Sequence, residues 1–120
     1  MSDQAGLDRR DYSHIDTREK AEALCAQGKL ERLWLLPEEF GGEDIPQNVV
    51  HVPLGFVEMK RKTDLDVIMP LVRAGKVVEY AAAPQYAGGC LVPTAILVTA
   101  TSPQRFAHLL RIWGEGLTQA

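Results

Sequence analysis

Residues 91–100 read LVPTAILVTA, and this run decides the fold class. It is rich in β-branched residues, and both of its alternating sets are largely apolar, as in a strand that is covered on both faces. A buried helix is the alternative, but Pro93 and the Val, Ile and Thr content favour a strand. Because proline cannot donate to a ladder, we expect regular pairing at or after Thr94, or a bulge there.

The preceding apolar run is VVEYAAA at residues 77–83, and it is more one-sided. Gly88 and Gly89 lie between the two runs and supply the backbone freedom that a turn with positive φ needs. The two runs therefore predict an antiparallel hairpin in the C-terminal half of the chain.

Upstream of the hairpin the sequence predicts one helix and two strands. Asp16 with Glu19 resembles a capping box, TREKAEALCAQ consists of good helix formers, and Gly28 can end the helix. Its inward face would contain Ala21, Leu24 and Cys25. LERLWLL at residues 30–36 and VVHV at residues 49–52 predict strands, and each run is followed by a proline.

Two further helices are predicted around the hairpin. Residues 55–75 have an apolar stripe of Phe56, Met59, Thr63, Val67 and Leu71, which leaves Lys60, Arg61, Lys62, Asp64 and Asp66 to solvent. Pro70 should kink or divide this helix near Met69, and Gly75 should end it. Ser102 and Pro103 read as the start of a last helix with the stripe Phe106, Leu109, Leu110 and Trp113.

These elements predict a single α+β domain over residues 16–120, preceded by a flexible leader at residues 1–15 that docks only through Leu7, Tyr12 and Ile15. We expect a mixed sheet of about four strands, with the hairpin at its centre and helices packed on it. The helix at 55–75 is long enough for a right-handed crossover between parallel neighbours.

Composition narrows the function classes. The chain has 120 residues and a net charge of -3, which gives no electrostatic footprint for nucleic acid. No run reaches the roughly 18 apolar residues of a membrane span, and no signal peptide is recognisable, so we expect a cytoplasmic protein. Cys25 and Cys90 have no metal spacing; two free thiols are favoured over a disulfide, which remains the alternative.

No catalytic constellation is visible. His14, His51 and His108 are scattered, and no Ser or Cys lies in a nucleophile-elbow pattern. Cys90 has no cationic neighbour to activate it, and the glycine pairs lack a phosphate-loop context. The sequence therefore predicts a protein that is not an enzyme and has neither a metal nor another cofactor.

The densest acidic cluster lies in the longest loop and is the predicted partner-binding site, made of Glu38, Glu39, Phe40, Glu43 and Asp44. Phe40 would be an apolar anchor inside a polar rim that fits a basic protein surface. In the alternative interpretation the loop is simply solvated, and Phe40 folds inward against the sheet edge.

Two other function classes stay open. In a small-ligand-binding protein or minor enzyme, the small side chains of Ala81, Ala82 and Ala83 could form the floor of a pocket on which Tyr80, Tyr86 and His51 converge. Close packing of a helix on these alanines is the plainer interpretation. Alternatively, an exposed strand edge could pair across a two-fold axis, which would make the protein a self-associating homodimer.

The segments LERLWLLPEEFGGEDIPQNVVHVP (residues 30–53), GKVVEYAAAPQY (75–86) and VPTAILVTA (92–100) resemble small bacterial immunity-type proteins encoded beside polymorphic toxins. Such proteins bind a toxin and block its active site. The resemblance implies a non-enzymatic inhibitor with a protein partner and no catalytic residues. By analogy, the acidic loop would contact the toxin, because many toxins that act on nucleic acid have basic active sites.

Overall fold

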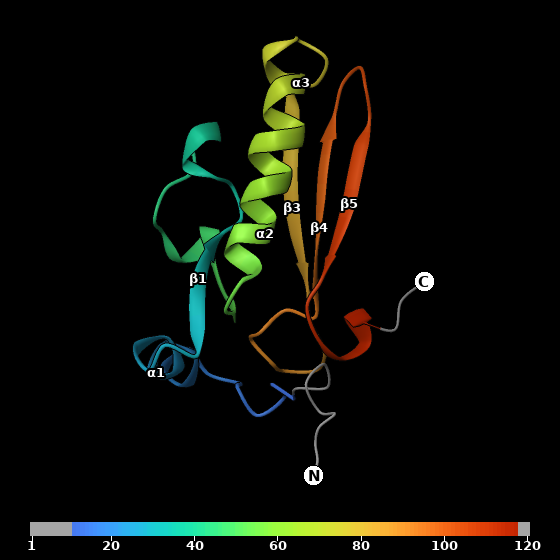
Figure 1. Ribbon diagram of the computed structural model, residues 1–120. Helices are drawn as coiled ribbons and strands as arrows, with labels where there is room; N and C mark the ends of the chain where they lie inside the picture. Colours follow the sequence, from blue (N-terminus) through green and yellow to red (C-terminus); the bar gives the residue numbers. More distant parts are fainter. Residues whose placement is uncertain (1–10, 118–120) are drawn as a thin grey trace.

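A computed structural model describes residues 11–117 of the chain (Figure 1). The elements, in order, are α1 (Arg18–Ala26), β1 (Leu30–Trp34), β2 (Val49–Pro53), α2 (Phe56–Lys62), α3 (Met69–Arg73), β3 (Glu79–Gln85), β4 (Ala95–Thr101) and β5 (Phe106–Arg111). A π-helical segment, Thr63–Ile68, joins α2 to α3 in one continuous helix. Short 3-10 turns lie at Glu38–Phe40, Pro46–Asn48 and Gly114–Leu117.

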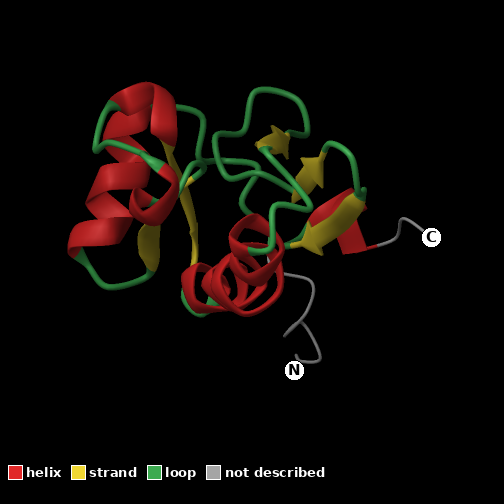
Figure 2. Ribbon diagram, turned by 90° about the horizontal axis from the view of Figure 1, so that it is seen from above, coloured by secondary structure: helices red, strands yellow, loops and turns green. Residues whose placement is uncertain are grey.

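The α+β class and the single domain are confirmed, but the predicted mixed sheet is wrong. The strands form two antiparallel sheets, one of β1 and β2 and one in the order β3-β4-β5. The helix from α2 to α3 connects β2 to β3, which lie in different sheets, so there is no parallel crossover between them. In the views from the side and from above, this helix stands between the two-stranded unit and the three-stranded sheet (Figures 1 and 2).

The predicted hairpin is confirmed. β3 pairs antiparallel with β4 from Glu79 opposite Thr101 to Gln85 opposite Ala95. Pairing starts where Pro93 allows it, because the Thr94 backbone N–H donates to the Gln85 carbonyl at 2.7 Å. Ile96 and Val98 are almost fully buried, so β4 is the centre of the core, as its apolar sequence indicated.

The predicted last helix is wrong, because Phe106–Arg111 is strand β5 and pairs antiparallel with β4. Ser102 has φ 76°, a left-handed conformation that belongs to a tight turn and not to a helix N-cap. The run FAHLLR is too short for its apolar spacing to separate a helix from a strand. The edge of β4 that β3 leaves free pairs with this run, and that pairing makes it a strand.

The N-terminal end of the described chain is docked on the core. Thr17, not Asp16, caps α1 by accepting a hydrogen bond from the Lys20 backbone N–H, while Asp16 pairs with the Lys20 ammonium at 2.8 Å. Ile15 is fully buried, and its carbonyl accepts from Leu91 N–H at 2.7 Å. The predicted docking of Tyr12 and Ile15 is therefore seen, whereas Leu7 lies outside the described residues.

Pro70 was predicted to kink or divide the long helix near Met69; the helix changes there from π to α geometry but continues through Pro70, which lies in the first turn of α3. Gly75 follows the end of the helix with φ 71°. Cys25 and Cys90 are both free thiols, which agrees with the favoured interpretation. Over residues 11–117, no helix combines the length and the apolar character that a membrane crossing requires.

Candidate functional site

The acidic loop at residues 37–48 is held in one shape by its own backbone and by Asn48. The Asn48 side chain accepts a hydrogen bond from Leu36 N–H at 2.8 Å and donates to the carbonyls of Leu36 and Glu43, each at 3.0 Å. Gly42 donates to the Pro37 carbonyl at 2.9 Å, and a Cβ at Gly42 would collide with the Leu36 carbonyl. Only glycine therefore allows this tight closure.

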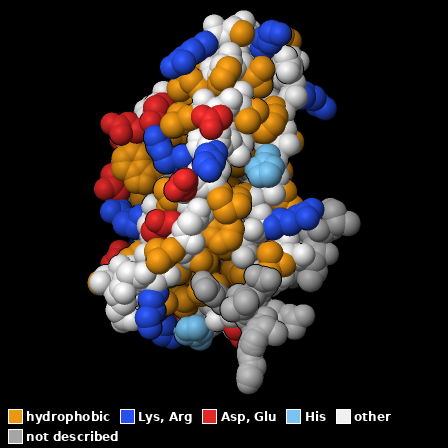
Figure 3. Space-filling view, in the orientation of Figure 1, with side chains coloured by type: hydrophobic (Ala, Val, Ile, Leu, Met, Phe, Trp, Pro, Cys, Tyr) orange, Lys and Arg blue, Asp and Glu red, His pale blue; other side chains and the backbone are white. Residues whose placement is uncertain are grey.

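The four carboxylates of the loop have two different environments. Glu39 pairs with Arg61 at 2.8 Å and Asp44 pairs with Arg32 at 2.6 Å. The hydrogen bond from Arg61 lowers the pKa of Glu39. Glu38 and Glu43 are exposed, and no ion pair within residues 11–117 includes either of them. In Figure 3, acidic and basic side chains gather along the left edge of the molecule, where β1 and this loop lie.

Phe40 does not project from the loop as an anchor. It is half-buried, and its ring centroid lies 5.0 Å from that of Tyr80. This is the alternative that the sequence left open, in which Phe40 folds inward against the sheet edge. The exposed apolar side chain of the loop is Ile45, which is 43% exposed.

The predicted orientation of the helix from α2 to α3 is partly wrong. Phe56 and Leu71 of the predicted stripe do pack against the core. Met59 and Val67, placed in the predicted core stripe, are 51% and 43% exposed, whereas Lys60 and Asp64, predicted to face solvent, are only 3% and 1% exposed. The inward residues are Val57, Lys60, Asp64, Ile68 and Leu71, which also recur every three or four positions. The sequence prediction failed because it assumed that the apolar set, and not the charged pair, would face the core.

Lys60 and Asp64 can be buried because they satisfy one another and Tyr80; we call these three residues the Lys60 cluster. The Lys60 ammonium donates to Asp64 Oδ2 at 2.6 Å and to the Tyr80 hydroxyl at 2.7 Å. The Tyr80 hydroxyl in turn donates to Asp64 Oδ1 at 2.8 Å, with the Leu35 carbonyl as a second acceptor at 3.3 Å. Residues of β3, of the long helix and of the segment directly after β1 thus meet in one buried polar cluster.

Burial changes the proton affinities within the cluster. It lowers the pKa of Lys60, and the hydrogen bond to Asp64 opposes this effect. Burial also raises the pKa of the Tyr80 phenol, and the neighbouring Asp64 carboxylate raises it further. Tyr80 therefore stays protonated over the physiological range and remains a hydrogen-bond donor.

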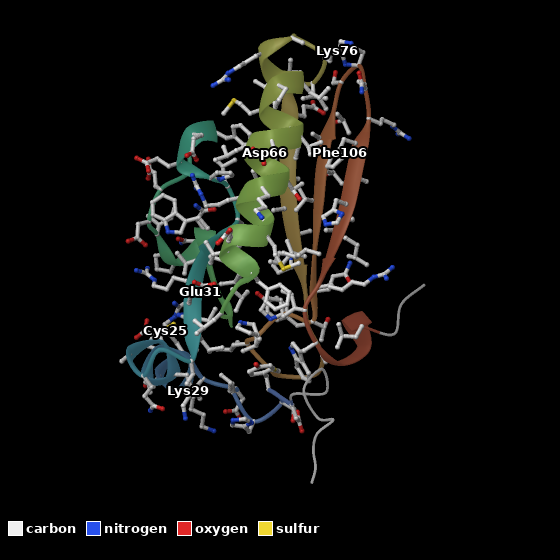
Figure 4. All side chains as sticks on the ribbon, in the orientation of Figure 1. Cys25, Lys29, Glu31, Asp66, Lys76 and Phe106 are labelled. Carbon is white, nitrogen blue, oxygen red and sulfur yellow. The ribbon has the colours of Figure 1, made fainter. Side chains whose placement is uncertain are left out.

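A cavity of about 230 Å³ adjoins the Lys60 cluster, between β1, the start of the acidic loop and α2. Its lining consists of Arg32, Leu33, Trp34, Pro37, Glu38, Val57, Lys60, Arg61 and Asp64. Glu31 fixes α2 beside β1, since its carboxylate accepts from Gly55 N–H at 2.7 Å at the start of the helix. Figure 4 shows Glu31 next to the lower end of α2.

The residues of the alternative ligand pocket do not come together. Along β3, Ala81 and Ala83 are exposed, whereas Tyr80 and Ala82 are partly buried and pack against the core. His51 lies on β2 in the other sheet, and Tyr86 follows the end of β3 with 43% exposure. The three alanines are therefore divided between two faces and do not form one pocket floor.

Among the side chains that the structure describes, residues 11–114, 116 and 117, no three His, Cys, Asp or Glu are placed to hold a metal ion. His51 is 5% exposed, and its Nε2 is a buried atom without a hydrogen-bond partner in that range. Burial lowers the pKa of His51, which keeps the ring neutral.

Sequence reasoning missed the Lys60 cluster, although one signal was available. Lys60 and Asp64 are four residues apart, the spacing of a helical ion pair, and both lie in phase with Val57 and Ile68. Tyr80 could not be joined to them from the sequence, because its place depends on how β3 packs on the helix.

Comparison of the chain with protein-family models, with curated proteins and with solved structures gave no match.

Proposed function

We propose that the protein is a non-enzymatic protein-binding module, an inhibitor of the immunity type that neutralises a toxin, and that loop 37–48 is its contact surface. The observation that supports this most is the fixed shape of the loop. Asn48, Gly42 and two ion pairs hold it before any partner arrives, while Glu38 and Glu43 are exposed. A loop that is already ordered loses little conformational entropy on binding.

The partner surface that fits this loop is basic. Glu38 and Glu43 supply negative charge that no internal cation within residues 11–117 pairs with, and such charges accelerate association with an oppositely charged protein. Ile45 takes the place that the sequence assigned to Phe40, as the exposed apolar contact inside an acidic rim. Glu39 and Asp44 contribute by holding the loop to Arg61 and Arg32.

The test compares two charge-reversed variants of equal net charge. Glu38→Lys/Glu43→Lys alters the loop, and Glu19→Lys/Glu58→Lys alters exposed carboxylates on α1 and α2. Affinity purification with quantitative mass spectrometry identifies the partner, and association rates are then measured against salt concentration. We expect the loop variant to associate at least about tenfold more slowly and with a weaker salt dependence than the control. Equal rates for both variants would exclude the loop as the contact surface.

Self-association is a second candidate, and one observation favours it. β5 is an edge strand of six residues with neither Pro nor Lys, whereas β3, the opposite edge, carries Pro84. Proline and lysine protect strand edges from pairing, so the β5 edge is the less protected one. Light scattering at high micromolar concentration tests this: a dimer that Leu109→Pro abolishes supports edge pairing, and a monomer excludes it.

A further inference from the structure

We propose that the cavity beside the Lys60 cluster binds a short dicarboxylate, with one carboxylate on the Lys60 ammonium and the other on the guanidinium groups at the cavity mouth. This inference goes beyond the proposed protein-binding function, because it concerns the cavity and not the outer surface of the loop, although Glu38 belongs to both.

The Lys60 ammonium has more hydrogen-bond donors than the cluster uses. An ammonium has three N–H groups, and within residues 11–117 the Lys60 ammonium uses two of them, toward Asp64 and Tyr80. The third has no acceptor among the described residues, and Lys60 is one of the residues that line the cavity.

The mouth of the cavity is also rich in donors. Arg32 and Arg61 line it, and each uses one terminal nitrogen in its ion pair with the loop, although a guanidinium carries five N–H donors. About half of each arginine side chain is exposed, 53% for Arg32 and 47% for Arg61, against 2% for Lys60. The donors therefore lie at two depths, which suits a ligand with two acceptor groups.

The geometry of the guanidinium groups, and not net charge, favours a carboxylate. Three cationic side chains line the cavity, Arg32, Lys60 and Arg61, together with the acidic side chains Glu38 and Asp64. Each of the three cations has one carboxylate partner, which leaves most of the guanidinium N–H groups unused. A carboxylate is the group that planar guanidinium donors bind with two parallel hydrogen bonds.

The size of the cavity limits the ligand. At about 230 Å³ it is smaller than the pockets of drug-sized molecules, which begin near about 300 Å³. The apolar part of the wall, Leu33, Trp34, Pro37 and Val57, would contact a short carbon chain between the two carboxylates.

The helix provides an independent reason to suspect a site. A buried ion pair is generally no more stable than well-packed apolar residues of the same volume, so its presence needs another explanation. Asp64 also lies in the π-helical segment, and such irregular turns occur frequently at functional sites. Here the irregular turn and the buried pair coincide at one cavity.

The test uses two probes, because the carboxylate could belong to a free acid or to a side chain of a partner. Succinate represents the free dicarboxylate, N-acetyl-glutamate amide represents a protein side chain, and 1,4-diaminobutane is a cationic control of similar length. Binding to the full chain is followed by NMR chemical shifts and by thermal stabilisation. We expect saturable binding of succinate, weaker binding of the glutamate derivative and no binding of the diamine. Tighter binding of the glutamate derivative than of succinate would overturn the dicarboxylate assignment.

Matched variants connect binding to the cavity. Lys60→Met should weaken succinate binding at least about tenfold, whereas Lys62→Met, on the same helix but 70% exposed, should leave it unchanged. If Lys60→Met does not fold, Lys60→Met/Asp64→Leu replaces the pair with apolar residues, and Arg61→Met removes an exposed donor at the mouth; both should show the same loss. The proposal fails if wild-type protein binds neither carboxylate, or if these variants bind succinate as the wild type does. Such a failure does not decide the loop proposal, which the association rates of the Glu38→Lys/Glu43→Lys variant test separately.

Discussion

The three-stranded sheet and the long helix differ in the kind of residue that they bury. In β4, Ile96, Val98 and Ala100 face the core with at most 1% exposure, as the alternation of an apolar strand dictates. In the helix from α2 to α3, a lysine and an aspartate are buried, while Met59 and Val67 are about half exposed. The sheet follows the rule of apolar residues inside, and the helix breaks it.

This difference indicates which part of the chain has residues that are not explained by stability alone. A sequence that satisfies local rules nearly everywhere tends to break them at functional or strained sites. In this molecule the departure from the rule coincides with the π segment, the cavity and the neighbouring acidic loop. The sheet is therefore the scaffold, and the face between β1 and α2 is the candidate functional region.

The largest expected effect comes from breaking the buried pair. Asp64→Ala leaves the Lys60 charge buried without its anion and should lower the free energy of unfolding by about 3–5 kcal/mol. Asp66→Ala, an exposed position two residues away, should change it by less than about 0.5 kcal/mol. Urea unfolding followed by tryptophan fluorescence measures both. Similar small losses for the two variants would mean that the helix is not turned as described.

A cavity in the centre of the sheet should come next. Ile96→Ala removes three carbon atoms from a fully buried site and should cost about 2–5 kcal/mol. Leu97→Ala, the neighbouring residue on the outer face, is half-buried and should cost clearly less. Thermal unfolding of the two proteins compares them directly, and a larger loss at Leu97 would reverse the assigned faces of β4.

His51 should make stability sensitive to mild acid. Its folded pKa is lowered by burial, so as the pH falls below the unfolded value near about 6.5 the unfolded chain takes up a proton first and stability decreases. The slope of the unfolding free energy should be at most about 1.4 kcal/mol per pH unit. Denaturation between pH 7.5 and 5.5 should show a flatter dependence for His51→Leu than for the wild type. His108→Gln, which alters an exposed histidine, is the control.

The smallest effect is expected at the exposed apolar positions of the helix. Met59→Gln and Val67→Gln should each change the free energy of unfolding by no more than about 0.5 kcal/mol, because these side chains are already about half in water. Chemical denaturation measures this. A loss as large as that of Ile96→Ala would restore the apolar stripe that the sequence predicted.

The elements with a clear hydrophobic period could be predicted from the sequence. Elements whose type or partner depends on tertiary packing could not. The β3-β4 hairpin follows from alternation and from Pro93, and α1 follows from helix formers before Gly28. β5 was missed because six residues with mixed spacing fit either period, and only the free edge of β4 selects a strand. The division into two sheets was also missed, because the pairing of strands depends on contacts between residues that are far apart in the sequence.

The candidate site shows the same limit. The acidic loop could be located from its composition, but the ion pairs of Glu39 and Asp44 depend on Arg61 and Arg32, which are 22 and 12 residues away. Phe40 turns inward because Tyr80, 40 residues later, offers a ring to pack on. Proximity of this kind is a property of the fold and leaves no local pattern.

One aromatic contact gives the molecule a built-in optical reporter. The Trp113 ring meets Tyr12 edge to face with centroids 5.7 Å apart, and its indole N–H donates to the Val92 carbonyl at 2.9 Å. Segments from opposite ends of the polypeptide thus converge on a single fluorophore. In a Trp34→Phe background, a red shift of the remaining emission would signal undocking of residues 11–15 before the rest of the domain opens.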